Sequence, residues 1–134
     1  MNRIVFLLVG SVLALSVTAC DTKQDVPSDV PFEALVANPG RYHGRQVCTE
    51  GIYATGFETN ALGASFRREG EAIYLTEPAM WLEGAEIRST SDCVESGAFP
   101  TATFCEATVC GLFEAGGNYG HLGGYAYQLR AEDR

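Results

Sequence analysis

The stretch RQVCTEGIYATGFE, residues 45–58, shows the side-chain alternation that decides the fold. Successive side chains of a β-strand point to opposite faces, so a two-residue period predicts a strand. One face of this strand would carry the residues Val47, Thr49, Gly51 and Tyr53. A glycine inside such a pattern indicates a bend or bulge, so Gly51 predicts that the strand is bent.

The remainder of the domain is also dominated by strand patterns. Further strands are predicted at residues 70–78, 79–84, 102–115 and 125–132. Residues 84–101 are polar and small, which predicts a loop. A single open sheet of five strands would leave its apolar face uncovered, whereas closure into a small barrel covers that face and removes the exposed edges. The sequence therefore predicts a mainly β domain built as a five-stranded barrel.

One short helix is predicted before the first strand, within SDVPFEALVANPGRYHG, residues 28–44. Asp29 is placed to cap it, and Pro31 fits the first turn. Asn38-Pro39-Gly40 would end it. The apolar residues that share one helical face are Phe32, Leu35 and Val36.

Two segments resemble bacterial envelope proteins with an OB-like barrel. FEALVANPGRYHGRQVCTEGIY, residues 32–53, resembles a helix ending in Asn-Pro, then a Tyr-x-Gly turn, then a first strand with a bend glycine. ATVCGLFEAGGNYGHLGGYAYQL, residues 107–129, resembles the later part of such domains. The resemblance implies an OB-like barrel over residues 31–134. The family consists mostly of uncharacterised lipoproteins, so the resemblance implies no activity.

The N-terminal segment resembles the signal peptide of bacterial lipoproteins. Arg3 precedes the apolar run 4–17, which is shorter than the roughly 20 residues of a membrane-spanning helix. Val17-Thr18-Ala19-Cys20 then resembles a lipobox. In lipoproteins the cysteine is acylated and the signal is cleaved before it, and two or more acyl chains anchor a protein stably. We therefore expect residues 1–19 to be a cleaved signal peptide and Cys20 to carry the lipid.

Residues 20–30 are expected to be the lipidated cysteine and a flexible tether. DTKQDVPSDV, residues 21–30, is polar and has no apolar period. Asp21 resembles the signal that retains lipoproteins in the inner membrane of enteric bacteria. The expected location is the periplasmic side of the cell membrane, with the inner membrane favoured and the outer membrane as the alternative.

The mature chain would be strongly acidic. Cleavage after residue 19 leaves 115 residues, and it removes Arg3, which lowers the formal net charge from −8 to −9. Nucleic-acid-binding proteins normally carry a basic patch that neutralises phosphates. The charge therefore argues against a nucleic-acid partner.

The four cysteines other than Cys20 are Cys48, Cys93, Cys105 and Cys110. An exported chain meets an oxidising compartment, so two disulfides are expected, and four cysteines allow three pairings. No CxxC motif is present, so neither a thioredoxin-like pair nor a zinc ribbon is indicated. The barrels that the chain resembles place their first and fourth strands side by side. Strand parity would then join Cys48 to Cys110 and leave Cys93 to pair with Cys105.

No catalytic motif is present, and we expect no cofactor and a non-enzymatic function. The two histidines, His43 and His121, lie 78 residues apart, and neither has a second ligand at metal-site spacing. We therefore expect both histidines to make hydrogen bonds to the backbone. The alternative hypothesis is a small envelope enzyme or metal-binding protein that uses both histidines and nearby acids.

The stretch GGNYGHLGG, residues 116–124, connects the last two predicted strands. It fits either a simple hairpin or a contact loop, because OB-folds bind ligands with loops around the barrel mouth. In the second case Tyr119, His121 and Tyr125 would contact the partner. The sequence thus predicts an envelope binding module whose partner is a protein, a peptide or a glycan. A purely structural stress lipoprotein without a ligand fits the same sequence features and is a further alternative.

Overall fold

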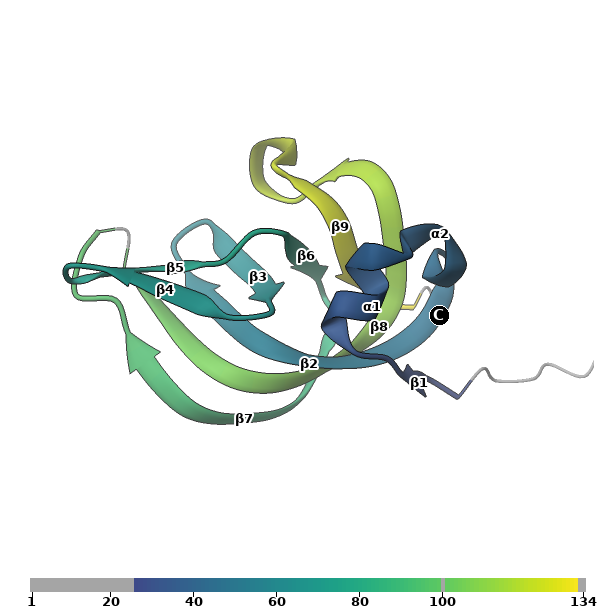
Figure 1. Ribbon diagram of the computed structural model, residues 1–134, viewed down its shortest axis with the longest axis horizontal. Coiled ribbons are helices and arrows are strands. Elements are labelled where there is room, and N and C mark those ends of the chain that lie inside the picture. The colour runs from purple at the N-terminus through teal and green to yellow at the C-terminus, as the bar shows by residue number, and fades with distance from the viewer. Residues whose placement is uncertain (1–25, 100, 133–134) are drawn as a thin grey trace, which may run out of the picture.

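The computed structural model describes residues 26–99 and 101–132 (Figure 1). The predicted signal peptide, Cys20 and the tether as far as residue 25 lie outside the described residues. The strands are β1 (Ser28–Asp29), β2 (Arg45–Gly56), β3 (Thr59–Gly63), β4 (Phe66–Glu69), β5 (Ala72–Leu75), β6 (Ala79–Glu83), β7 (Glu86–Glu95), β8 (Ala102–Tyr119) and β9 (Tyr125–Arg130). The helices are α1 (Phe32–Ala37), α2 (Pro39–Tyr42) and the single 3-10 turn η1 (His121–Gly123).

The prediction of a mainly β domain is confirmed, but the prediction of five strands is wrong, because the described chain has nine. The missed strands are β1, β3, β4 and β7. The largest error is β7, which replaces the loop predicted at 84–101. Eight of its ten residues are exposed and none is buried, so it lacks the apolar face that a period-2 pattern detects. β4 was missed because its sequence, FRRE, is mostly charged.

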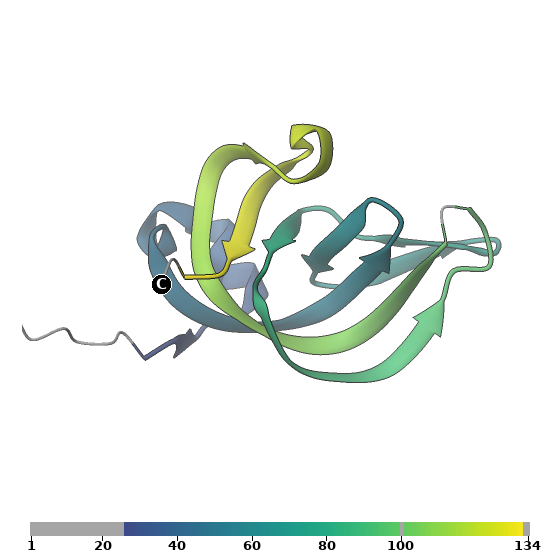
Figure 2. The same ribbon diagram turned by 180° about the vertical axis from the view of Figure 1, so that it is seen from behind.

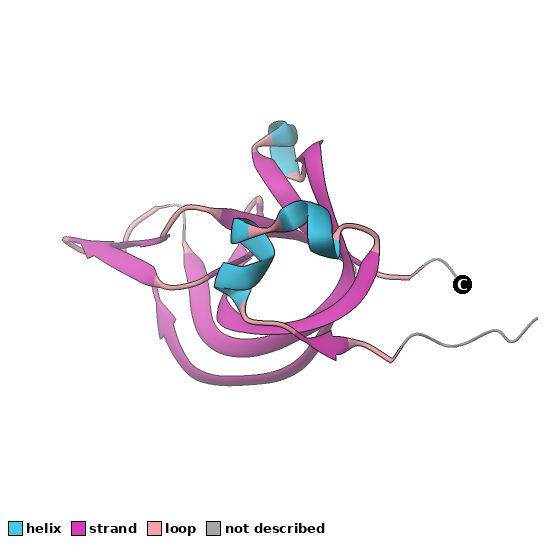
Figure 3. Cartoon of the chain, turned by 45° about the vertical axis from the view of Figure 1, so that its right-hand side comes forward, coloured by secondary structure: helices cyan, strands magenta, loops and turns pink. Residues whose placement is uncertain are grey.

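The prediction of one short helix is also corrected, because α1 and α2 follow one another (Figure 3). Asn38 ends α1, since its N–H bonds the Ala34 carbonyl at 3.1 Å, and Pro39 then starts α2. Asp29 does not cap α1. It lies in β1, whose residues pair in parallel with β2. α1 buries Phe32 and Leu35 against the curved strands.

Five of the strands pair in a closed circuit. β2 pairs with β8 along its whole length, from Arg45 opposite Phe113 to Gly56 opposite Ala102. The circuit continues from β2 to β3, β6 and β9, and returns to β8. Within this circuit the β6–β9 pair is parallel and the other four pairs are antiparallel. β1 and β7 lie outside the circuit as edge strands, and β4 and β5 form a separate two-stranded sheet.

The main core lies on one face of the β2–β8 pair. The faces follow strand parity, as predicted for Val47 and for Val109 and Phe113, all of which are fully or almost fully buried. The largest buried side chains are Phe113, Leu35, Leu62, Met80, Leu82, Leu129, Val47 and Val109.

A second, smaller core occupies the end of the molecule that carries the β4–β5 hairpin. Ala54 and Phe104, at the far ends of β2 and β8, have the opposite parity to the main core and pack with Ile73 of β5. Phe66 of β4 adds a ring contact with Phe104 at 6.2 Å between centroids. The hairpin therefore covers the reverse face of the long strands at the end far from β1 (Figures 1 and 2). We call this region the hairpin end.

Two disulfides cross-link the sheet, and both pairings are those expected from strand parity combined with the strand order of the barrels that the chain resembles. Cys48 is bonded to Cys110, its register partner across the β2–β8 pair. Cys93 of β7 is bonded to Cys105 of β8. The Cys48–Cys110 bond lies on the face opposite to the main core, as expected, but both cysteines are buried, at 2% and 3% exposure.

Candidate functional site

The hairpin end contains a groove of about 540 Å³. Six consecutive residues, 72–77, form one wall and include all of β5. The floor comes from the ends of β2 and β8, and the other walls come from the turn after β7 and from β3, β6 and β9. The remaining lining residues are Ala54, Thr59, Arg67, Ala79, Ser96, Phe99, Ala102, Phe104 and Tyr125.

The groove has an apolar floor and an exposed aromatic rim. Ala54, Ile73 and Phe104 are buried at its base. Tyr74 is 40% exposed and Phe99 is 82% exposed at its edge. Phe99 also contacts the exposed ring of Phe57, with centroids 6.5 Å apart. Solvent-exposed aromatic groups gathered around a concavity are typical of contact sites, because they bring large apolar area at low entropic cost.

Hydrogen bonds hold the turn that carries Phe99 against the hairpin. The buried Ser96 Oγ accepts a bond from the Ile73 N–H at 3.2 Å, and the Gly97 N–H donates to the Glu71 carbonyl at 2.9 Å. The Ser96 N–H donates to the Ala102 carbonyl at 2.9 Å, which ties the two ends of the turn together. These bonds connect the start of the turn to the hairpin and to the first residue of β8.

The groove is lined by one basic residue, Arg67, and one acidic residue, Glu77, and within the described chain only the basic residue has an ion-pair partner. The Arg67 guanidinium lies 4.9 Å from the ring centre of Tyr74 and forms an ion pair with Glu69, so its charge is already matched. Glu77 accepts a bond from the Ala79 N–H at 3.2 Å, and no basic side chain within residues 26–99 and 101–132 forms an ion pair with it. Burial, together with the negative charge of Glu77, raises the pKa of the Tyr125 hydroxyl. Glu77 and Tyr125 both line the groove.

Of the three predicted contact residues, the structure brings only Tyr125 to the groove. Tyr125 also packs on Trp81 of β6, with ring centroids 5.5 Å apart. Tyr119 folds against the backbone of Gly117, and burial followed by the charge of Glu114 raises its pKa. His121 Nε2 instead lies 3.3 Å from a Glu58 carboxylate oxygen, which joins the β8–β9 connection to the β2–β3 turn.

Gly120 sets the path of this connection. Its φ is +70° and its ψ is −163°, a region that essentially only glycine adopts, and an added Cβ would lie 2.6 Å from the Trp81 ring. The Gly120 backbone therefore packs directly on the indole whose ring contacts Tyr125.

Gly120→Ala is expected to lower the free energy of unfolding by about 2 kcal/mol, because it adds backbone strain and a clash with Trp81. Gly116→Ala is the matched control, since Gly116 also has a positive φ but open space around it. Chemical denaturation followed by Trp81 fluorescence measures both, and Gly120→Ala should cost more and shift the native emission. Equal costs with unchanged emission would contradict the packing described here.

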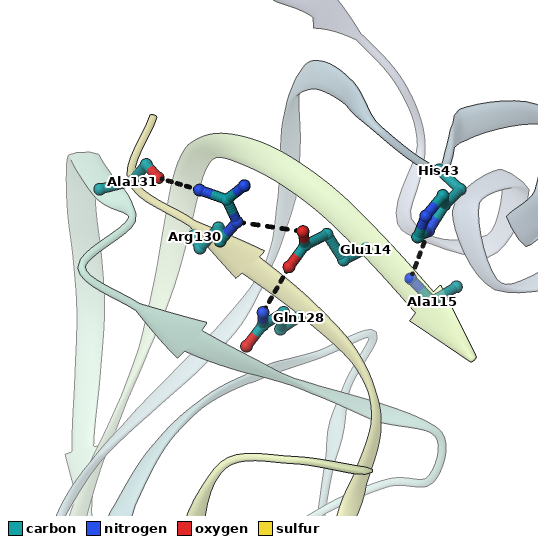
Figure 4. A network of polar contacts seen from close by, with 6 residues as sticks. All are labelled: His43, Glu114, Ala115, Gln128, Arg130 and Ala131. Atoms are coloured by element: carbon teal, nitrogen blue, oxygen red, sulfur yellow. Dashed lines mark hydrogen bonds and ion pairs between the residues drawn. The ribbon is translucent and has the colours of Figure 1, made fainter. Parts of the chain in front are cut away.

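His43 belongs to a separate polar network near the C-terminal end of β8 (Figure 4). Its Nδ1 accepts a bond from the Ala115 N–H at 3.0 Å. The neighbouring Glu114 accepts a bond from Gln128 at 2.5 Å and pairs with Arg130 at 3.1 Å. The bond from Gln128, joined by the Arg130 guanidinium, lowers the pKa of the Glu114 carboxyl group. His43 thus bonds backbone, as predicted, whereas His121 bonds a carboxylate.

The two histidines have different partners, since His43 bonds the Ala115 backbone and His121 lies beside Glu58. In residues 26–99 and 101–132 no group of three histidine, cysteine, aspartate or glutamate side chains is arranged to hold a metal ion. No helix within this same described part is long and apolar enough to span a membrane.

Sequence reasoning missed the two residues that form the rim. Tyr74 was placed in a strand without a role, and Phe99 was placed in a predicted loop. The available signal was the isolated aromatic residue in the polar stretch 84–101, together with Phe57 in the turn after the first long strand. Comparisons of the chain with protein-family models, with curated proteins and with solved structures find no match.

Proposed function

We propose that the protein is a lipid-anchored lipoprotein of the bacterial cell envelope whose domain binds a partner and performs no chemistry. The partner is an envelope protein, a peptide or a glycan, and it contacts the groove at the hairpin end. One observation supports the binding role. The groove has a buried apolar floor, and the aromatic side chains at its edge are exposed to solvent because no other part of the described chain covers them.

We further propose that β2, β3, β6, β9 and β8 are the five strands of an OB-like barrel. Their closed circuit of pairings supports this assignment, as does the parallel β6–β9 pair within it. On this assignment β1, β7 and the β4–β5 hairpin are additions to the barrel. The groove is built largely from two of those additions, the hairpin and the turn after β7.

The position of the anchor favours a partner on the side away from the membrane. The described chain begins next to β1, and the β4–β5 hairpin lies at the opposite end of the longest axis (Figures 1 and 2). A lipid on Cys20 would attach the domain through the end opposite to the groove and would leave the groove free to contact a periplasmic partner.

Site-specific photocrosslinking in cells tests this function. A photoreactive phenylalanine analogue at Phe99 is expected to capture a discrete partner, while the same analogue at Arg41, an exposed residue of α2, gives at most one tenth of that yield. Both proteins should be present at equal levels in the membrane fraction. Equal capture from the two positions would overturn the proposed binding site.

A further inference from the structure

The groove follows the free edge of a strand. β5 belongs to a two-stranded sheet and pairs with β4 on one side only. In an antiparallel pair, alternate residues direct their backbone groups to opposite edges. The Thr76 N–H bonds the Ser65 carbonyl on the β4 side, so Ile73 and Leu75 direct theirs to the other edge. The bond from the Ile73 N–H to Ser96 Oγ agrees with this alternation.

Only the first part of that edge is covered. Ser96 and Gly97 bond the backbone at Ile73 and Glu71. Further along, the described residues supply no hydrogen-bond partner for the N–H and carbonyl groups of Leu75. Ser96 and every residue of 72–77 line the groove, so the uncovered part of the edge opens into it. An edge of this kind is a template for an added strand.

The side chains around the edge determine which residue types the added strand should carry. The apolar floor of Ile73 and Phe104 can accept an aliphatic or aromatic side chain, and Tyr74 and Phe99 can enclose it. Glu77 supplies an unmatched negative charge beside this position, since Arg67 is already paired with Glu69. The whole chain has a formal net charge of −8, which further favours a cationic ligand.

We propose that the groove binds an extended peptide segment of an envelope protein, which adds to β5 as a strand. The peptide places an apolar side chain over Ile73 and Phe104 and a lysine or arginine against Glu77. This inference rests on the proposed binding function and narrows its partner from protein, peptide or glycan to one class. A glycan has no main chain of alternating N–H and carbonyl groups at strand spacing and could not pair with the edge of β5, so glycan binding is the competing outcome.

The probe is a pool of synthetic heptapeptides, random in sequence and blocked at both ends, incubated with the purified full-length protein in detergent. Bound peptides are separated by gel filtration and sequenced by mass spectrometry. We expect enrichment of peptides that carry an apolar residue and a lysine or arginine an even number of positions apart, because both side chains must then point to the same face of the added strand. The best peptide, resynthesised singly, should change the fluorescence of Trp81, the only tryptophan, whose ring is 5.5 Å from Tyr125 in the groove.

Three changes then test the mode of binding. Two N-methylated peptides are compared, one methylated at the odd-numbered amides and one at the even-numbered amides. One of them should bind with a Kd at least tenfold higher, because methylation then removes the main-chain bonds to β5. Glu77→Gln should raise the Kd about fivefold for the basic peptide and leave unchanged the Kd of the same peptide with its basic residues replaced by glutamine. Leu122→Ala, at a residue that is 92% exposed outside the groove, should leave the Kd unchanged.

The inference is overturned if no peptide is enriched over the pool retained by a Tyr74→Ala/Phe99→Ala protein, if acidic peptides are selected, or if N-methylation has no effect in either register. It is also overturned if a chitin tetrasaccharide binds the groove and displaces the selected peptide. In any of these cases, capture of a partner from Phe99 in cells would still support the proposed function. Loss of that capture would instead refute the function itself.

Discussion

Replacing Cys48 and Cys110 together by alanine is expected to lower the free energy of unfolding by about 4 kcal/mol. The bond closes a loop with a sequence separation of 62, and a cross-link stabilises mainly by reducing the entropy of the unfolded chain, more so for longer loops. For a domain of about 100 residues this corresponds to a fall in Tm of roughly 15–30 °C. Denaturant unfolding without reductant, compared with the parent protein, measures the loss.

The Cys93→Ala/Cys105→Ala protein is the matched control. Its loop spans only 12 residues in separation, so the same account predicts a smaller loss of about 3 kcal/mol. The Cys48–Cys110 bond also joins register partners in the β2–β8 pair, so its loss should also weaken the pairing that closes the circuit of strands. Peptide mapping without reductant gives an independent check. A Cys48–Cys93 linkage would contradict the strand order, and a larger loss from the shorter loop would contradict the entropic explanation.

Cys20→Ser is expected to abolish membrane anchoring. Only a thiol at this position can be acylated in a lipoprotein, so the variant should either appear in the soluble fraction or accumulate as an uncleaved precursor. Mass spectrometry of the unaltered mature protein should show an N-terminal acylated cysteine followed by Asp21. Asp21→Ser is the control, because it leaves the lipobox intact and should change at most which membrane holds the protein. A mature chain that begins at any other residue would refute the lipid anchor.

The long strands β2 and β8 could be predicted because one face of each is buried against the main core, and burial on one face enforces a two-residue period. That period fixed the faces of Val47 and Phe113 correctly. It also led to the observed disulfide partners, once the first and fourth predicted strands were placed side by side.

Strand β7, the packing of the β4–β5 hairpin and the groove could not be predicted, because they depend on contacts that a local sequence pattern does not show. β7 is held by main-chain bonds to β8 and by the bond from Cys93, not by an apolar face, so its side chains carry no period. The covering of Phe104 by the β4–β5 hairpin depends on tertiary contacts between segments more than 25 residues apart. The groove arises from that covering. Only Tyr125 was identified among its lining residues, because only Tyr125 lies beside a glycine-rich loop that suggested a contact surface.

The most direct test of the account compares two double variants, each carrying the photoreactive analogue at Phe99. Phe57→Ala/Tyr74→Ala removes exposed aromatic groups at the hairpin end. Tyr119→Ala/His121→Ala alters the β8–β9 connection that the sequence suggested. The account predicts that partner capture falls at least fivefold in the first variant and stays near the parent level in the second, with both melting temperatures within a few degrees of the parent. Undiminished capture in the first variant, or loss of capture in the second alone, would contradict the placement of the binding site in the groove.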